Sequence, residues 1–217
     1  MSPYKIGTQY DLIATWWNER HSDSDYGVPQ VEKALAFTKQ GGKALDIGCG
    51  AGGRFIRKCE EHGLEVLGID ASAKMINLAK QNHPHLRFIH DDIRDWESEE
   101  RFDFILAWDC LFHLPLKAQK PVLSKLCQML TENGVLIHTF GDADGEHTDH
   151  WHNQKFTYSS IGISKNNQLL HENGLTPLHL ELDQFPENHV FAISKKKHPQ
   201  LPPRINSHAP REVVDNV

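Results

Sequence analysis

Glycines and an acid lie close together in the stretch DIGCGAGG, which begins at Asp46. Gly48, Gly50 and Gly53 fit the pattern G-x-G-x-x-G, whose glycines let the backbone approach the phosphates of a dinucleotide. Asp46 precedes the first glycine, and a carboxylate in this place would repel a pyrophosphate. The loop therefore predicts a nucleotide-containing ligand, and Asp46 favours a ligand whose charged groups are cations.

Further acids follow the next two expected strands. Asp70 ends the stretch EVLGID, where a carboxylate can accept hydrogen bonds from ribose hydroxyls. After LRFIH, Asp92 can accept from an adenine amino group while the backbone N–H of Ile93 meets a ring nitrogen, and Asp91 is the alternative to Asp92. S-adenosylmethionine has a ribose and an adenine, carries no phosphate, and offers Asp46 a sulfonium and an ammonium group. We therefore expect this cofactor. NAD, which uses the same ribose device, is the alternative.

The elements that must position these residues alternate along the chain. Apolar runs (KALDIG, EVLGID, LRFIH, FDFILAW and VLIHTF) are separated by amphipathic stretches, a pattern that predicts right-handed βαβ units and a parallel sheet. The last two expected strands, LTPLHLELDQ and NHVFAISKK, are separated by FPE alone and should pair antiparallel. The predicted fold is α/β: a Rossmann-like, doubly wound, mostly parallel seven-stranded sheet with a final antiparallel strand pair and helices on both faces. The carboxyl ends of its strands are the expected ligand site.

Read together, these stretches resemble the class I S-adenosylmethionine-dependent methyltransferases of small molecules. The resemblance covers roughly Gly41 to Gly141 and includes FDFILAWDCLFHLP and LTENGVLIHTFG. Three motifs carry it, matched by Asp46, Gly48, Gly50 and Gly52, then by Asp70, then by Phe102, Asp103, Leu111, His113 and Leu114.

The resemblance implies direct in-line methyl transfer from S-adenosylmethionine to a small-molecule acceptor. Because the sulfonium is already activated, such an enzyme mainly supplies proximity and alignment. An NAD-dependent oxidoreductase and a non-catalytic S-adenosylmethionine-binding module are the alternatives. The expected cofactor-binding residues are Asp46, Gly48, Cys49, Gly50, Gly52, Asp70, Ala71, Asp92, Ile93 and Trp108.

Two residues after the fourth strand are candidate catalytic groups. The family places residues next to the transferable methyl group here, and Asp109 could orient a cationic substrate or take a proton. It could instead cap the following turn. His113 titrates near neutrality and could act as a base, or it could be a packed or turn-stabilising histidine.

The acceptor pocket is expected from two segments. Residues before the first motif fold over the cofactor in this family, so aromatic side chains there should form a cover. The polar segment 141–158 is expected to be a lid loop that faces the methyl group. Its close His and Asp residues could also bind a metal, but tight spacing in a loop is weak evidence, and no metal is predicted. The expected substrate-binding residues are Tyr10, Trp16, Tyr26, His150, His152 and Tyr158.

Composition limits the remaining possibilities. The chain has 217 residues and a formal net charge of -6, which argues against nucleic acid as partner. No apolar run approaches a membrane span, no signal peptide is recognisable, and the cysteines have no C-x-x-C spacing. We expect a cytoplasmic protein without a membrane partner, with its oligomeric state open. The expected organisation is one domain over 1–195, made of a helical cap (1–42), a cofactor-binding core (43–140), the lid loop (141–158) and a C-terminal helix and strand pair (159–195), followed by an extended tail (196–217).

Overall fold

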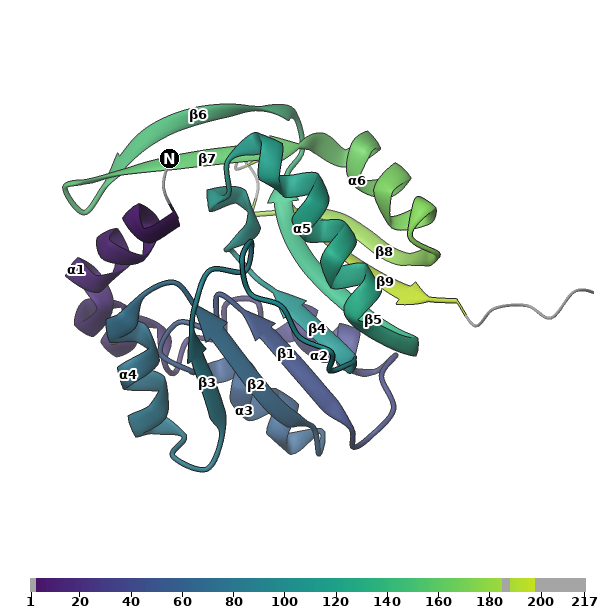
Figure 1. The fold of residues 1–217 in the computed structure, drawn as a ribbon, viewed down its shortest axis with the longest axis horizontal. Coiled ribbons are helices and arrows are strands. Elements are labelled where there is room, and N and C mark those ends of the chain that lie inside the picture. The colour runs from purple at the N-terminus through teal and green to yellow at the C-terminus, as the bar shows by residue number, and fades with distance from the viewer. Residues whose placement is uncertain (1–2, 185–187, 198–217) are drawn as a thin grey trace, which may run out of the picture.

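A seven-stranded sheet is the centre of the computed structural model, which describes residues 3–184 and 188–197 (Figure 1). Its strands are β1 (Lys43–Ile47), β2 (Glu65–Asp70), β3 (Arg87–His90), β4 (Phe102–Ala107), β5 (Leu130–Gly141), β8 (Leu175–Asp183) and β9 (His189–Lys196). Their order across the sheet is β3-β2-β1-β4-β5-β9-β8. The first five strands pair in parallel, and β9 is antiparallel to β5 and β8. The predicted fold class is confirmed.

The last strand of the chain lies inside the sheet. β9 fits between β5 and β8, and because it runs against β5, its first residue, His189, lies opposite Gly141, the last residue of β5. The start of β9 therefore lies at the same sheet edge as the carboxyl ends of the parallel strands. This direction brings a C-terminal residue to the edge where a ligand is expected.

Helices cover both faces of the sheet. They are α1 (Pro3–His21), α2 (Val28–Leu35), α3 (Arg54–Glu61), α4 (Ala73–Asn82), the short 3-10 helix η1 (Leu111–His113), α5 (Leu116–Met129) and α6 (Gly162–Glu172). In Figure 1, α2 and α3 lie behind the sheet and α5 lies in front of it. Alternate residues of β4 divide between these layers: Phe104 and Leu106 pack with α2 and α3, whereas Ile105 packs with α5.

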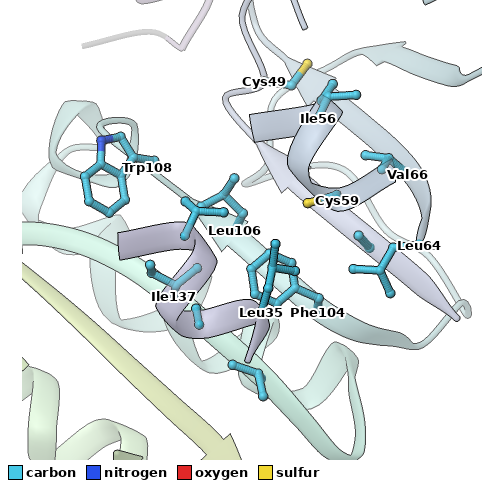
Figure 2. Close-up of a cluster of buried hydrophobic side chains, with 14 of the residues drawn as sticks. Leu35, Cys49, Ile56, Cys59, Leu64, Val66, Phe104, Leu106, Trp108 and Ile137 are labelled. Carbon is cyan, nitrogen blue, oxygen red and sulfur yellow. The ribbon is translucent and has the colours of Figure 1, made fainter. Parts of the chain in front are cut away.

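The cluster behind the sheet reaches from the helices to the functional edge. Figure 2 shows Leu106 in one cluster with Leu35 of α2 and Ile56 of α3, with the indole of Trp108 at one end of the group. Trp108 is 5% exposed, although it follows β4 directly. A residue of the sheet edge is thus held rigidly by the core.

The segment predicted to be a lid loop is a β-hairpin instead. β6 (Asp144–Trp151) and β7 (Gln154–Ile161) pair antiparallel as a separate two-stranded sheet that extends over α1 (Figure 1). The turn residues His152 and Asn153 have φ of 48° and 59°, the signs of a type I′ turn. The prediction was wrong because nearly all of β6 is exposed, so it lacks the apolar alternation of a half-buried strand, and the turn contains no glycine.

The segment 1–42, predicted as a cap, divides into two parts. Helix α1 lies against α4, where Asp11 accepts hydrogen bonds from Ser72 Oγ at 2.6 Å and from the backbone N–H of Lys74 at 2.9 Å. Helix α2 belongs to the core instead, because its residues Val31 and Ala34 are fully buried under the sheet. Residues 198–217, most of the predicted tail, lie outside the described residues.

Candidate active site

The glycine loop after β1 closes tightly because its glycines adopt the left-handed conformation. Gly48 has φ of 68°, and a Cβ there would overlap the side chain of Cys110. Gly50 has φ of 55°, and the nearest atom to a Cβ there would be Nε1 of Trp17 at 3.7 Å. Gly48 therefore serves packing, whereas Gly50 keeps space open at the sheet edge.

Asp70 fixes this loop and interacts electrostatically with a second carboxylate, that of the buried Asp46. Its oxygens accept hydrogen bonds from the backbone N–H groups of Gly50 at 2.9 Å and Ser72 at 2.8 Å. Burial raises the pKa of Asp70 above its ordinary value. Burial, with repulsion from Asp70, raises the pKa of Asp46 to about 8. Asp46 is therefore largely protonated near neutral pH, and a bound cation would favour its ionised form.

The third predicted acid has a partner of its own. Asp92 is buried, and its carboxylate accepts hydrogen bonds from Nε of Arg94 at 3.2 Å and from Nη2 at 3.0 Å. The backbone N–H of Arg94 also donates to Asp92 at 2.8 Å. Asp91, Asp92 and Ile93 all line the cavity described next. An interaction of Asp92 or Ile93 with adenine stays a prediction.

A cavity of about 320 Å³ lies along the carboxyl ends of the parallel strands. This volume falls within the range of small-molecule sites. Of the cofactor residues expected from the sequence, only Gly52 does not line it, because Gly52 packs against Ala79 and His83. The predicted residues that line the cavity are Tyr10, Tyr26, Asp46, Gly48, Cys49, Gly50, Asp70, Ala71, Asp92, Ile93, Trp108, Asp109 and His113.

Cysteine chemistry is not a feature of this cavity. Cys49 and Cys110 both line it, and burial, reinforced by nearby acids, raises the pKa of each thiol well above its ordinary value. A thiol with a raised pKa is a poor nucleophile because the thiolate is scarce.

Asp109, in the cavity wall, has hydrogen-bond partners from three other parts of the chain. It has φ of 52°, which is unusual for a residue other than glycine. Its backbone N–H donates to Oγ1 of Thr139 at 2.8 Å, and its Oδ2 accepts from the hydroxyl of Tyr26 at 2.9 Å. Burial first, and then Asp109, raises the pKa of Tyr26, so its hydroxyl stays protonated as a donor. Strained backbone held by such bonds is common at functional sites.

His189 was missed by the sequence analysis and contacts Asp109. Its Nε2 lies 2.8 Å from Oδ1 of Asp109, and its Nδ1 contacts Oδ1 of Asp183. Burial opposes a charge on His189, but the bonds to Asp109 and Asp183 outweigh it and raise the pKa of the histidine. The only sequence signal is the pair Asp183 and His189 at the facing ends of the two C-terminal strands.

His113 forms a hydrogen-bonded pair with Tyr10. Nδ1 of His113 lies 3.3 Å from the carbonyl oxygen of Thr157, and Nε2 lies 2.9 Å from the hydroxyl of Tyr10. A carbonyl only accepts, so Nδ1 carries the proton and Nε2 accepts from Tyr10. Burial lowers the pKa of His113 to about 4 and raises that of Tyr10 well above its ordinary value. The pair is therefore neutral and joins α1, η1 and β7.

Four residues predicted to bind the acceptor do not line the cavity. Trp16 packs instead on the hairpin, with its ring 5.4 Å from that of Trp151 and 4.1 Å from that of His152. Its neighbour Trp17 lines the cavity, because successive helix residues point in different directions. From the hairpin, Glu146 and Thr157 reach the cavity. The four predicted residues outside the cavity wall are Trp16, His150, His152 and Tyr158.

Arg54 is a cationic side chain of the cavity wall and is half-buried. Its Nε donates to the carbonyl of Tyr26 at 2.6 Å and its Nη1 to that of His21 at 3.1 Å. The guanidinium lies 4.2 Å from the ring centroid of Phe55. Burial lowers the pKa of Arg54, yet arginine stays charged at neutral pH.

The fold and the site define the class of S-adenosylmethionine-dependent methyltransferases. A family model described as "Methyltransferase domain" matches residues 20–180, and the chain belongs to this family. Magnesium protoporphyrin IX methyltransferase from Synechocystis PCC 6803, solved with S-adenosylmethionine bound, has the same fold, with a TM-score of 0.68 and 18% identity over 91% of this chain and 98% of that one.

Curated relatives match over shorter stretches. Phosphoethanolamine N-methyltransferase 2 of Caenorhabditis elegans is 30% identical over 127 residues, which are 55% of this chain and 29% of the relative. Trans-aconitate 2-methyltransferase of Rhizobium etli is 30% identical over 105 residues, which are 48% of this chain and 40% of the relative. The matched part thus spans less than half the length of both relatives.

The cavity fits S-adenosylmethionine, the cofactor of this class. Asp70 supplies negative charge for its cationic groups, as does Asp46 when a bound cation favours its ionised form, and the open space at Gly50 lets a ligand approach the backbone. Asp46 favours S-adenosylmethionine over NAD, because a carboxylate at this position would repel a pyrophosphate. Within the residues that the structure describes, no helix is long and apolar enough to cross a membrane.

Proposed function

We propose that this protein transfers a methyl group from S-adenosylmethionine to a small amine. The observation that carries the proposal is the position of Asp109 in the cavity wall, next to the aromatic rings of Tyr26 and Trp108. A carboxylate attracts an ammonium group, and aromatic faces stabilise cations. Together they form a site for a positively charged acceptor.

The cavity wall divides into a donor part and an acceptor part. We assign the donor part to Asp46, Gly50 and Asp70, with the adenine end at Asp92 and Ile93. When bound, S-adenosylmethionine supplies an activated methyl group. The acceptor part is then left to the remaining polar and aromatic lining residues: Tyr10, Tyr26, Arg54, Trp108, Asp109 and His113.

An amine in its ammonium form has no lone pair and must lose a proton before it can accept a methyl group. We assign this proton to the carboxylate of Asp109, which faces the cavity and is oriented by Tyr26 and His189. His113 suits this task less, because the buried imidazole is neutral and does not attract an ammonium group, and its Nε2 already accepts from Tyr10. In this proposal His113 orients the hydroxyl of Tyr10 toward the cavity.

Arg54 indicates which amines the cavity would bind. Its guanidinium lines the same cavity as Asp109 and provides a positive charge for an anionic substituent of the acceptor. A small amine that also carries a phosphate or carboxylate would use both residues. Phosphoethanolamine, named for the Caenorhabditis elegans relative, has this combination.

The experiment is a comparison of acceptors of different chemistry with the purified protein. Formation of S-adenosylhomocysteine is measured with phosphoethanolamine, with ethanolamine, with trans-aconitate and with a simple phenol. We expect turnover with amines, and faster turnover when the amine carries an anionic group. Turnover of trans-aconitate or the phenol with none of the amines would refute the amine assignment while leaving methyl transfer in place.

A further inference from the structure

Three potential metal ligands meet outside the cavity, beside the glycine loop. Glu60 lies near the end of α3, His83 follows the last residue of α4, and His85 lies between α4 and β3. Their ligand atoms all lie within 4.8 Å of one another. An ion bound to all three would draw the ligand atoms slightly closer together, because ligands about 2.0–2.2 Å from zinc lie within roughly 4 Å of each other.

The ring of His83 is oriented as in a metal site. Its Nε2 lies 2.5 Å from the carbonyl oxygen of Gly52. A carbonyl only accepts, so Nε2 carries the proton and the lone pair of the neutral ring is on Nδ1. Histidine ligands of metals typically donate their other ring N–H to a carbonyl or a carboxylate, and Gly52 takes that role here.

The lone pair of His83 points toward a negative charge. Its Nδ1 lies 3.2 Å from Oε2 of Glu60. The repulsion between a lone pair and a carboxylate is removed either by a proton on Nδ1 or by a metal cation between the two atoms, and the metal titration below distinguishes the two cases. Within the described part of the chain, no lysine or arginine pairs with Glu60, whose ion-pair partners are His83 and His85.

His85 completes the group and leaves it accessible. Its Nε2 lies 2.5 Å from Oε1 of Glu60, on the other oxygen of the carboxylate. The side chain of His85 is 63% exposed and that of Glu60 28%, whereas His83 is buried. An ion could therefore enter from solvent and keep water in its remaining coordination positions.

We propose that Glu60, His83 and His85 bind a divalent transition-metal ion, with Zn²⁺ as the reference ion. Two imidazoles and a carboxylate suit such ions better than Mg²⁺ or Ca²⁺, which prefer oxygen ligands. The ion would join the end of α3 to the connection between α4 and β3. Through His83 and Gly52 it would also brace the glycine loop. The sequence gives no signal for this site, because His85 is 25 residues from Glu60.

The test uses the full chain, freed of metal with a chelator. Zn²⁺ is titrated by calorimetry, and Co²⁺ is added in a separate sample because its visible absorption reports nitrogen and oxygen coordination. We expect one Zn²⁺ per chain, and a rise in the melting temperature with metal. Glu60→Gln and His85→Ala should each lower the Zn²⁺ affinity roughly tenfold or more and reduce the Co²⁺ absorption.

The exposed histidines of the hairpin give a matched control. The double variant His150→Ala, His152→Ala removes two exposed imidazoles and should leave Zn²⁺ affinity unchanged. Metal-free melting temperatures show whether each variant folds. The proposal is overturned if Zn²⁺ does not bind the wild type, or if folded Glu60→Gln and His85→Ala proteins bind it as tightly as the wild type. Loss of binding in the hairpin variant alone would also overturn it.

Discussion

Nε2 of His189 lies 2.8 Å from Oδ1 of Asp109, a residue 80 positions earlier in the chain. The contact exists because β9 runs antiparallel to β5 and begins at the edge where the parallel strands end. Asp109 lines the cavity. His189 does not line the cavity, and it contacts Asp183 as well as Asp109. We infer that His189 is a positioning residue: it holds the Asp109 carboxylate toward the acceptor and does not touch the acceptor itself.

Replacing His189 should slow turnover without weakening cofactor binding. A charge-assisted hydrogen bond is worth about 1.5–3 kcal/mol, so His189→Leu should lower kcat roughly tenfold or more. His189→Gln retains an N–H donor and should recover part of the loss. Calorimetry should give the wild-type affinity for S-adenosylmethionine in both variants, because His189 does not line the cavity.

The pH profile separates this role from a purely structural one. Because the pKa of His189 is raised in the folded protein, the stabilising imidazolium is fully present below pH 6.5 and is lost as the pH rises through the raised value. The profile of kcat should therefore change in His189→Gln. His179 of β8, which contacts Glu181, serves as the control. The variant His179→Gln should leave the pH profile of kcat unchanged. If His189→Gln has an unchanged pH profile of kcat and a lower melting temperature, His189 contributes only to packing.

Asp46→Asn should stabilise the free protein while weakening cofactor binding. The folded pKa of Asp46 is about 8, above its ordinary 3.8, so its favourable contribution is complete below pH 3.8 and is lost as the pH rises through 8. Asparagine has the same shape and no charge. Melting temperatures measured from pH 4 to about 8 should diverge, with the variant increasingly the more stable. If the wild type and Asp46→Asn melt at the same temperature over this whole pH range, the ionised Asp46 carboxylate does not destabilise the folded protein.

Gly50→Ala should abolish or strongly weaken S-adenosylmethionine binding. A methyl group at Gly50 would enter the open space of the cavity and would also strain a residue with φ of 55°. Gly41→Ala is the matched control, because Gly41 has φ of 72° and a Cβ there meets nothing within 4 Å. Both changes cost roughly 1–2 kcal/mol of backbone strain. Equal affinities in the two variants would mean that Gly50 does not cradle the cofactor.

The neighbours Trp17 and Trp16 offer a second matched pair. Trp17 lines the cavity, and its ring lies 5.8 Å from that of Tyr10, whereas Trp16 packs on the hairpin. Trp17→Ala should therefore raise the apparent Michaelis constant for the cofactor or for the acceptor. Trp16→Ala should mainly lower the melting temperature. Steady-state kinetics and thermal unfolding of both proteins provide the comparison. The opposite pattern would restore the sequence-based assignment of Trp16 to the acceptor pocket.

The sequence predicts the cofactor half of the site well because its residues follow strands directly. Asp46, Gly48 and Asp70 lie at the ends of buried strands whose apolar runs are easily recognised, and parallel order brings those ends together. The position of Asp109 in the cavity follows from the same rule.

The acceptor half could not be predicted to the same extent. His189 reaches the site only because β9 inserts between two other strands, and strand order is not encoded in any local pattern. The sequence does not predict the hairpin, because β6 is nearly all exposed and therefore lacks the apolar alternation of a half-buried strand. The difference between Trp16 and Trp17 depends on the rotation of α1 against the hairpin, which is a tertiary property.

The central claim is that Asp109 takes the proton of a small amine acceptor. The most direct measurement compares Asp109→Asn with the wild type in S-adenosylhomocysteine formation from phosphoethanolamine, as a function of pH. General-base catalysis contributes about 10²–10⁴-fold, so the variant should lose at least 100-fold in kcat near neutral pH, with unchanged S-adenosylmethionine affinity. Its rate should recover as the pH approaches the value at which the amine is deprotonated in solution. Wild-type kcat in a folded Asp109→Asn protein, at every pH, would contradict the account.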